Sequence, residues 1–129
     1  MVAQAKTVFD NGFNGKLNGD RHSTDIGGSG ESFVPYELLY GALSSCVHAT
    51  ILGIVRKMRL KYETCTYDVT GDKRNEIPAF LTDVYFKVTM TGVENEEKMN
   101  KAIELGTEYC SIYNTLAKVA KMHLEIEYK

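Results

Sequence analysis

The chain has 129 residues, of which 43% are hydrophobic and 25% charged, and its net charge is −2. This balance is typical of one domain, residues 1–129, with an ordinary core, and it excludes the strongly basic surface of a nucleic-acid binder. The N-terminus has no apolar segment of the signal-peptide type, and no apolar run is expected to span a bilayer. We therefore expect a cytoplasmic protein without a membrane or nucleic-acid partner.

The first part of the chain is predicted to form three short strands. Residues 2–9 alternate in polarity, and Asp10-Asn11-Gly12 is a strong hairpin signal. Two further antiparallel strands are expected over residues 13–17 and 22–26, followed by the flexible loop Gly27-Gly28-Ser29-Gly30. This stretch is too short to hold a core of its own.

The clearest predicted helix begins at Pro35 and continues to about Met58. Proline is tolerated in a first turn, and Glu37 suits the positive end of the helix dipole. Apolar residues recur at helical spacing over much of the circumference. We therefore expect this helix to be buried at the centre of the fold.

Two strands, two helices and a last strand are predicted to follow. The first strand covers residues 60–71. One face of the second is marked by Phe80, Val84, Phe86, Val88 and Met90. A second helix starts at Asn95 and is capped at Gly106, a third runs over residues 110–121, and residues 123–128 form the closing strand. The order βββ-α-ββ-αα-β predicts an α+β fold.

The three cysteines are the main candidates for functional side chains. In a reducing compartment disulfides are usually transient and catalytic, and an odd number of cysteines argues against a fully paired scaffold. Cys110 lies at the expected start of the third helix, where free backbone N–H groups favour a thiolate. Cys46 lies deep in the first helix, and its apolar stripe taken alone favours a core residue. Cys65 is expected to be a packed thiol on a strand.

Two segments then indicate a family. Pro35-Tyr36-Glu37-Leu38-Leu39 through Cys46, followed by Cys110-Ser111-Ile112-Tyr113-Asn114-Thr115-Leu116, resembles the OsmC/Ohr family of thiol peroxidases and organic hydroperoxide resistance proteins. In that family a P-x-E-L-L-x-x-A-x-x-x-C-like helix carries one cysteine, and a C-P-x-S-N-x-L-like segment carries the other. The similarity extends to residues 71–78. It implies an OsmC-like fold of antiparallel strands around a long central helix, in an intertwined homodimer.

The resemblance also implies a mechanism. Cys46 would be the peroxidatic thiol that reduces an organic hydroperoxide, and Cys110 the resolving thiol that forms a disulfide with it. An external dithiol would then reduce this disulfide, and no cofactor is implied. The substrate pocket would be lined by Tyr36, Leu39, Tyr40 and Leu43.

The chain departs from the family pattern at three positions. The family's catalytic glutamate stands ten residues before the first cysteine, where this chain has Tyr36. Glu37 is the candidate replacement, although a shift of one residue turns a helical side chain by about 100°. Arg21 is the candidate for the arginine that pairs with this glutamate. Ser111 replaces the usual proline, and Tyr113 the usual serine.

Other interpretations stay open from the sequence. Glu37 fits equally well as a first-turn residue that matches the helix dipole, and Arg21 as an exposed turn residue. A catalytically weak or inactive OsmC-like dimer that binds an apolar ligand is the main alternative function. A metal site built from Cys46, Cys110 and a histidine is disfavoured, because the chain has no C-x-x-C or H-x-x-x-H pair. His22 and His123 have no partner at a recognisable spacing.

Overall fold

The computed structural model describes residues 3–28 and 30–129, which form two compact units, the first ending at Gly41 and the second beginning at Ala42. The order of elements is the predicted one, and the fold is α+β as expected. The single-domain organisation stays a prediction. The elements are β1 (Lys6–Phe9), β2 (Asn14–Asn18), β3 (Ser23–Gly27), α1 (Pro35–Met58), β4 (Thr64–Lys73), β5 (Leu81–Thr91), α2 (Glu96–Tyr109), α3 (Ser111–Ala117) and β6 (Lys121–Tyr128).

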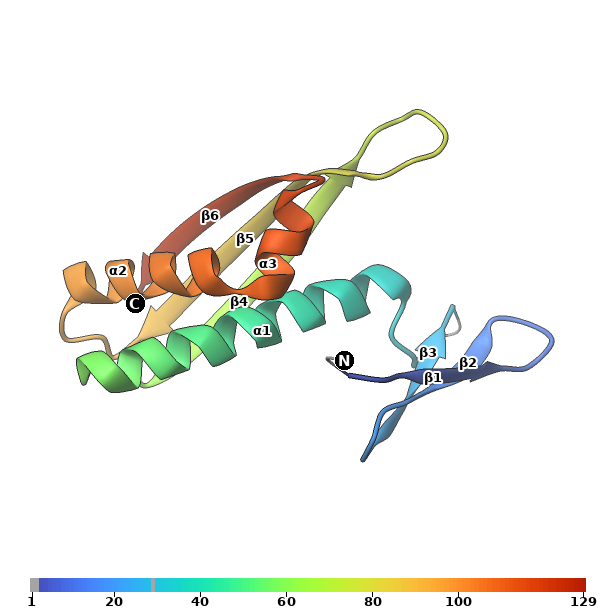
Figure 1. Ribbon diagram of the computed structural model, residues 1–129, viewed down its shortest axis with the longest axis horizontal. Helices are drawn as coiled ribbons and strands as arrows, with labels where there is room; N and C mark the ends of the chain where they lie inside the picture. Colours follow the sequence, from blue (N-terminus) through green and yellow to red (C-terminus); the bar gives the residue numbers. More distant parts are fainter. Residues whose placement is uncertain (1–2, 29) are drawn as a thin grey trace. The chain divides into compact units, whose positions relative to one another are not determined.

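The first unit is a small antiparallel sheet with the strand order β1-β2-β3, drawn in blue in Figure 1. The predicted hairpin turn is present, because the Asp10 carboxylate accepts a hydrogen bond from the N–H of Gly12 at 2.7 Å. β1 begins at Lys6, later than predicted; the proposed start at Val2 lies outside the described residues. Ile26 is buried, whereas Phe9 and Phe13 stack on each other and stay half exposed.

Helix α1 has the predicted bounds, and both its ends follow from local chemistry. Pro35 opens the helix, and Arg56 and Lys57 lie in its last turn, where the dipole is negative. The helix stops because Arg59 adopts a left-handed conformation with a φ of 56°. The N–H groups of Arg59 and Leu60 then bond to the carbonyls of Arg56 and Val55, which is a Schellman motif formed without glycine.

By length and composition alone, α1 could cross a membrane, contrary to our expectation that no run of this chain would be apolar enough. One such helix is weak support for a membrane span, because the core helix of a globular fold passes the same test. Leu43, Val47, Ile51 and Val55 of α1 are buried in the core of the second unit. One face of α1 therefore packs in this core.

The second unit is a three-stranded sheet with β5 in the centre, antiparallel to β4 and parallel to β6. Every second residue of β5 is fully buried, as the sequence pattern predicts: Val84, Phe86, Val88 and Met90. Figure 1 shows α2, α3 and the adjoining part of α1 on one face of this sheet. Phe80 does not belong to the buried face; it precedes β5, is 43% exposed, and lies under the Arg74 guanidinium.

Two predicted helix ends were wrong. Gly106 does not cap α2 but lies within it, buried against Ile51 of α1, and α2 continues to Tyr109. α3 ends at Ala117 instead of residue 121, because the chain tightens into a turn in which the N–H of Ala120 bonds to the carbonyl of Leu116. β6 therefore begins at Lys121, two residues earlier than expected.

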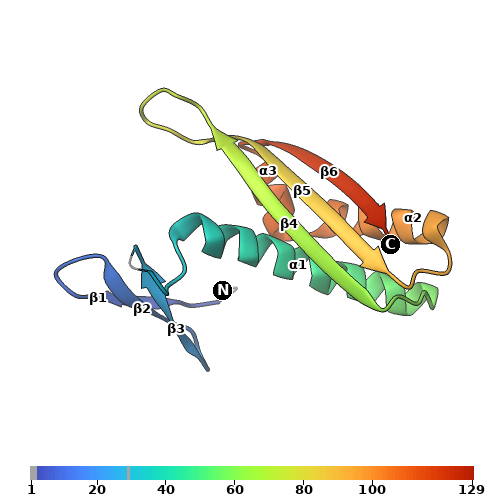
Figure 2. The same cartoon turned by 180° about the vertical axis from the view of Figure 1, so that it is seen from behind.

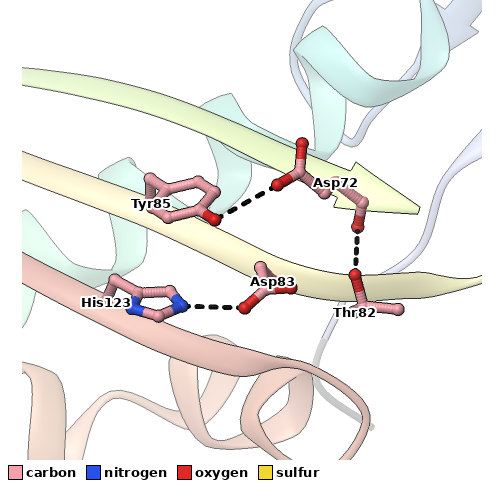
Figure 3. A network of polar contacts seen from close by, with 5 residues as sticks. All are labelled: Asp72, Thr82, Asp83, Tyr85 and His123. Carbon is pink, nitrogen blue, oxygen red and sulfur yellow. Dashed lines mark hydrogen bonds and ion pairs between the residues drawn. The ribbon is translucent and has the colours of Figure 1, made fainter. Parts of the chain in front are cut away.

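The other face of this sheet is polar and faces the viewer in Figure 2. In Figure 3 His123 of β6 bonds to the carboxylate of Asp83 on β5 at 2.8 Å. The Tyr85 hydroxyl donates to the Asp72 carboxylate at 3.2 Å, and the Tyr85 ring stacks on His123. Sequence spacing pointed to no partner for His123, because parallel pairing of β5 and β6 joins residues 40 positions apart.

Candidate thiol active site

The sulfur atoms of Cys46 and Cys110 lie 2.9 Å apart, close together as the proposed pairing requires. Both cysteines are free thiols, and the S–H of Cys110 donates to the sulfur of Cys46. Cys46 lies in the middle of α1, and Cys110 in the one-residue connection between α2 and α3. The fold thus brings two thiols 64 residues apart in the chain into direct contact.

Cys110 is held by the start of α3. It is the N-cap residue of this helix, and its sulfur accepts a hydrogen bond from the N–H of Tyr113 at 3.4 Å. The side-chain amide of Asn114 donates to the carbonyls of Cys110 and Glu108, at 2.8 and 2.7 Å. These two bonds tie the end of α2 to the start of α3, so the backbone that carries the Cys110 thiol is fixed.

The two thiols have opposite electrostatic environments. Cys110 is 1% exposed, and burial, together with the hydrogen bond to Cys46, raises its pKa above the ordinary value. Burial also disfavours ionisation of the half-buried Cys46. Hydrogen bonds from Cys110, from the N–H of Ile112, and from the hydroxyl and N–H of Ser111 outweigh that cost, so the pKa of Cys46 is lowered. Cys46 is the more acidic and the more accessible thiol.

This division reverses one expectation. The start of the third helix was expected to favour a thiolate at Cys110, which lies there in the sequence. In the structure Cys110 keeps the N–H of Tyr113, but the N–H groups of Ser111 and Ile112 and the Ser111 hydroxyl also donate to Cys46, which reaches them from α1. Sequence position locates the donors, but the packing of α1 beside α3 decides which thiol receives them.

The other predicted catalytic residues lie in the first unit. Glu37 uses its carboxylate locally, because it accepts a hydrogen bond from the N–H of Val34 at 3.0 Å, just before α1. Arg21 is exposed in the turn between β2 and β3. Their catalytic roles therefore stay predictions.

The residues predicted to line the substrate pocket differ in exposure. Tyr36, Leu39 and Tyr40 are half buried, and the rings of the two tyrosines lie 5.8 Å apart. Leu43 is 0% exposed and packs in the core of the second unit. A role of these four residues in binding substrate stays a prediction.

A second polar cluster lies between α1 and β4. His48 bonds to the Tyr67 hydroxyl through its Nδ1 atom at 2.8 Å, and this hydroxyl also interacts with the Cys65 thiol. Burial raises the pKa of Cys65, so this thiol is a poor nucleophile, as expected for a packed cysteine. Sequence analysis missed the His48–Tyr67 contact, which only the packing of a helix on a strand creates.

Among residues 3–28 and 30–129, no group of three or more His, Cys, Asp or Glu side chains could hold a metal ion. The cluster of Cys46, Cys110 and Ser111 offers two thiols and a hydroxyl. Two thiols in direct contact can together give two electrons and two protons to an oxidant and form a disulfide, and a reductant can return them.

A comparison with protein families finds one match. The sequence profile described as "OsmC-like protein" matches residues 28–125. No curated protein sequence matches the chain significantly.

Several solved structures share the fold. A hypothetical protein from Aquifex aeolicus has a TM-score of 0.88 at 21% identity, covering 100% of this chain and 97% of its own. An OsmC-like protein from Mycoplasma pneumoniae has a TM-score of 0.87 at 16% identity, covering 99% and 97%. The organic hydroperoxide resistance protein OhrB of Bacillus subtilis has a TM-score of 0.73 at 13% identity, covering 98% and 99%. With most of its length matched by the family profile, this chain belongs to the OsmC-like protein family.

Proposed function

We propose that this protein is a thiol peroxidase that reduces organic hydroperoxides through Cys46 and Cys110. The observation that carries the proposal is the 2.9 Å contact between an accessible thiol of lowered pKa and a buried thiol of raised pKa. Relatives of the same fold that are described as organic hydroperoxide resistance proteins support the substrate class.

The proposed roles follow from accessibility and acidity. The nucleophile in peroxide reduction is a thiolate that the substrate can reach, and Cys46 meets both conditions. Its thiolate attacks the terminal oxygen of R–O–O–H. The S–O bond forms as the O–O bond breaks, the sulfur is oxidised to a sulfenic acid, and the alkoxide leaves and takes a proton to become an alcohol.

Cys110 completes the cycle. Its sulfur, already in contact with Cys46, attacks the sulfenic acid, so that an S–S bond forms and water leaves. An external dithiol then reduces the disulfide by thiol–disulfide exchange and returns both thiols. A reducing cytoplasm would supply such a dithiol, and no cofactor takes part.

Stoichiometric oxidation tests this function. The reduced protein is mixed with one equivalent of cumene hydroperoxide or hydrogen peroxide, and the loss of thiols is followed in a quenched-flow experiment. An apolar pocket stabilises an alkyl group by about 25 cal/mol per Å² buried and offers hydrogen peroxide nothing comparable. We therefore expect the organic peroxide to react faster.

The matched variants are Cys46→Ser and Cys65→Ser, each of which removes one thiol from the second unit. Cys46→Ser should abolish the fast reaction, and Cys65→Ser should leave it unchanged. Equal, slow rates with both peroxides that persist in Cys46→Ser would contradict a peroxidase. The alternative, a non-enzymatic dimer that binds an apolar ligand, would then stand; the local use of the Glu37 carboxylate is the observation that favours it.

A homodimer is part of the proposal. Only 22% of the apolar stretch of α1 is buried within one chain. Ala42, Ser45, Ala49 and Gly53 are exposed at helical spacing, which leaves a face of small side chains that a second helix could approach closely. Equilibrium sedimentation should give a dimer at micromolar concentration. Ala49→Glu, which would place two like charges at the contact, should dissociate it, whereas Lys101→Glu, at an exposed position of α2, should not.

A further inference from the structure

We propose that the Ser111 hydroxyl is a catalytic hydrogen-bond donor to the oxygen atom that is transferred from the peroxide to Cys46. The inference rests on the proposed function and identifies a donor at the same site. The observation behind it is that Ser111 Oγ lies 4.0 Å from Cys46 Sγ, on the helix that Cys110 begins.

The Ser111 hydroxyl is better placed to bond to an oxygen attached to Cys46 Sγ than to the sulfur itself. At 4.0 Å the hydroxyl makes only a weak hydrogen bond to Cys46 Sγ. An oxygen atom one covalent bond away from that sulfur can lie within the roughly 2.7–2.8 Å typical of O–H···O bonds, between the two residues. The hydroxyl is thus placed to bond more strongly to the oxygen that arrives during the reaction than to the Cys46 sulfur beforehand.

Ser111 is held in position independently of this contact. Its carbonyl accepts a hydrogen bond from the Thr115 hydroxyl at 2.8 Å. The preceding Cys110 carbonyl accepts from the N–H of Asn114 at 3.0 Å and from its side chain at 2.8 Å. These bonds fix the backbone that carries the hydroxyl, so only the rotation of the serine side chain has to be ordered when the oxygen arrives.

The hydroxyl has a defined part in a balanced step. As the Cys46 thiolate attacks the terminal oxygen of R–O–O–H, the S–O bond forms and the O–O bond breaks. Negative charge spreads over both oxygens; the leaving alkoxide takes a proton from water, and the transferred oxygen stays on sulfur as the sulfenic acid. The Ser111 hydroxyl donates to this transferred oxygen throughout and keeps its own proton.

Serine is also the informative residue at this position. The family pattern has proline directly after the second cysteine, and proline carries neither a hydroxyl nor an N–H. Ser111 supplies both near Cys46. The inferred donor is therefore a property of this chain and not of the general pattern.

The test compares an electrophile that delivers oxygen with one that does not. Ser111→Ala, Ser111→Thr and the control Ser45→Ala, an exposed serine beside Cys46 in the sequence, are reacted with cumene hydroperoxide and with iodoacetamide. Rates are measured across pH and compared on the plateau where Cys46 is fully ionised, which removes any change in its pKa.

Loss of one hydrogen bond to a charged group should slow oxidation of Cys46 by about tenfold in Ser111→Ala. Alkylation should change less than twofold, because iodoacetamide transfers no oxygen. Ser111→Thr keeps a hydroxyl and should restore most of the oxidation rate, and Ser45→Ala should match the unmodified protein.

Two results would overturn the inference. One is a Ser111→Ala oxidation rate equal to that of Ser45→Ala; the other is an equal fall in oxidation and alkylation, which would show a general disturbance of the thiolate. Failure of the proposed function has a different signature: Cys46 of the unmodified protein would be alkylated but not oxidised by the peroxide.

Discussion

Gly106 of α2 packs against Ile51 of α1 so closely that a methyl group on Gly106 would overlap the Ile51 side chain. Both residues are buried, and the added Cβ would overlap Ile51 Cγ1, an atom close to the backbone, so Ile51 or the helices would have to shift. We expect Gly106→Ala to lower the free energy of unfolding by about 1–3 kcal/mol, as overpacking of a core does.

Urea denaturation measures this effect. Lys101→Ala on the exposed side of α2 is the matched control and should change stability by less than about 0.5 kcal/mol. Alanine forms helices better than glycine, so a stabilised Gly106→Ala protein would mean that α2 can move away from α1 at little cost.

The pH dependence of alkylation should separate the cysteines. Because the pKa of Cys46 is lowered from 9.0 and that of Cys65 is raised, Cys46 should become reactive toward iodoacetamide at a lower pH than Cys65. The rate follows the thiolate fraction, so the Cys46 curve should rise first as the pH increases. Peptide mass spectrometry resolves the two sites, and coincident curves would argue against selective activation of Cys46.

Removing the resolving thiol should separate the oxidation of Cys46 from the formation of the disulfide. In Cys110→Ser we expect Cys46 to be oxidised once and to remain as a sulfenic acid, because no neighbouring thiol can condense with it. Dimedone labelling detects this species by mass. The unmodified protein and Cys65→Ser should form the disulfide and bind little dimedone; strong labelling of both would mean that Cys110 does not resolve.

Oxidation should stabilise the fold. A bond between Cys46 and Cys110 would close a loop of 64 residues, and the chain-entropy relation gives about 4 kcal/mol for such a loop. The thiols already touch in the reduced state, so little rearrangement would offset this gain. We expect a higher melting temperature after one equivalent of peroxide, and no rise in Cys46→Ser treated in the same way.

The polar sheet face should add a small pH-dependent term to stability. Hydrogen bonds from His123 and Thr82 lower the pKa of Asp83 from its ordinary value of 3.8. Stability from this carboxylate is therefore present above about pH 4 and is lost as the pH falls through the lowered value. Asp83→Asn should be less stable than the unmodified protein near pH 6, with the difference shrinking in more acidic solution; Asp68→Asn on the same face is the control.

The sequence carries the order of the elements and the bounds of α1, because these depend on local signals. Pro35, the charged residues of the last turn and the alternation in β5 each act within a few positions of the chain. Gly106 shows where local signals mislead: a glycine near the end of a helical pattern resembles a cap, but here it allows two helices to touch.

The site was predictable in part. The cysteine motifs indicated Cys46 and Cys110, whose sulfurs are in contact, yet the division of acidity between them depends on how α1 meets α3. The partners of His48 and His123 were not predictable, since each contact joins elements whose register only the folded chain sets. Hydrogen bonds across packed elements leave no periodic trace in a sequence.

The parallel pairing of β5 with β6 has a consequence for how the thiol pair assembles. Parallel neighbours cannot be joined by a tight turn, so the chain must cross back over the sheet, and α2, Cys110 and α3 form that crossover. The C-terminal strand β6 holds the far end of this crossover by pairing with β5. Cys110 lies within this long connection, so its place beside Cys46 depends on the pairing of β6 with β5 as well as on α1. A chain shortened within residues 121–128 would keep both cysteines and still lose their alignment.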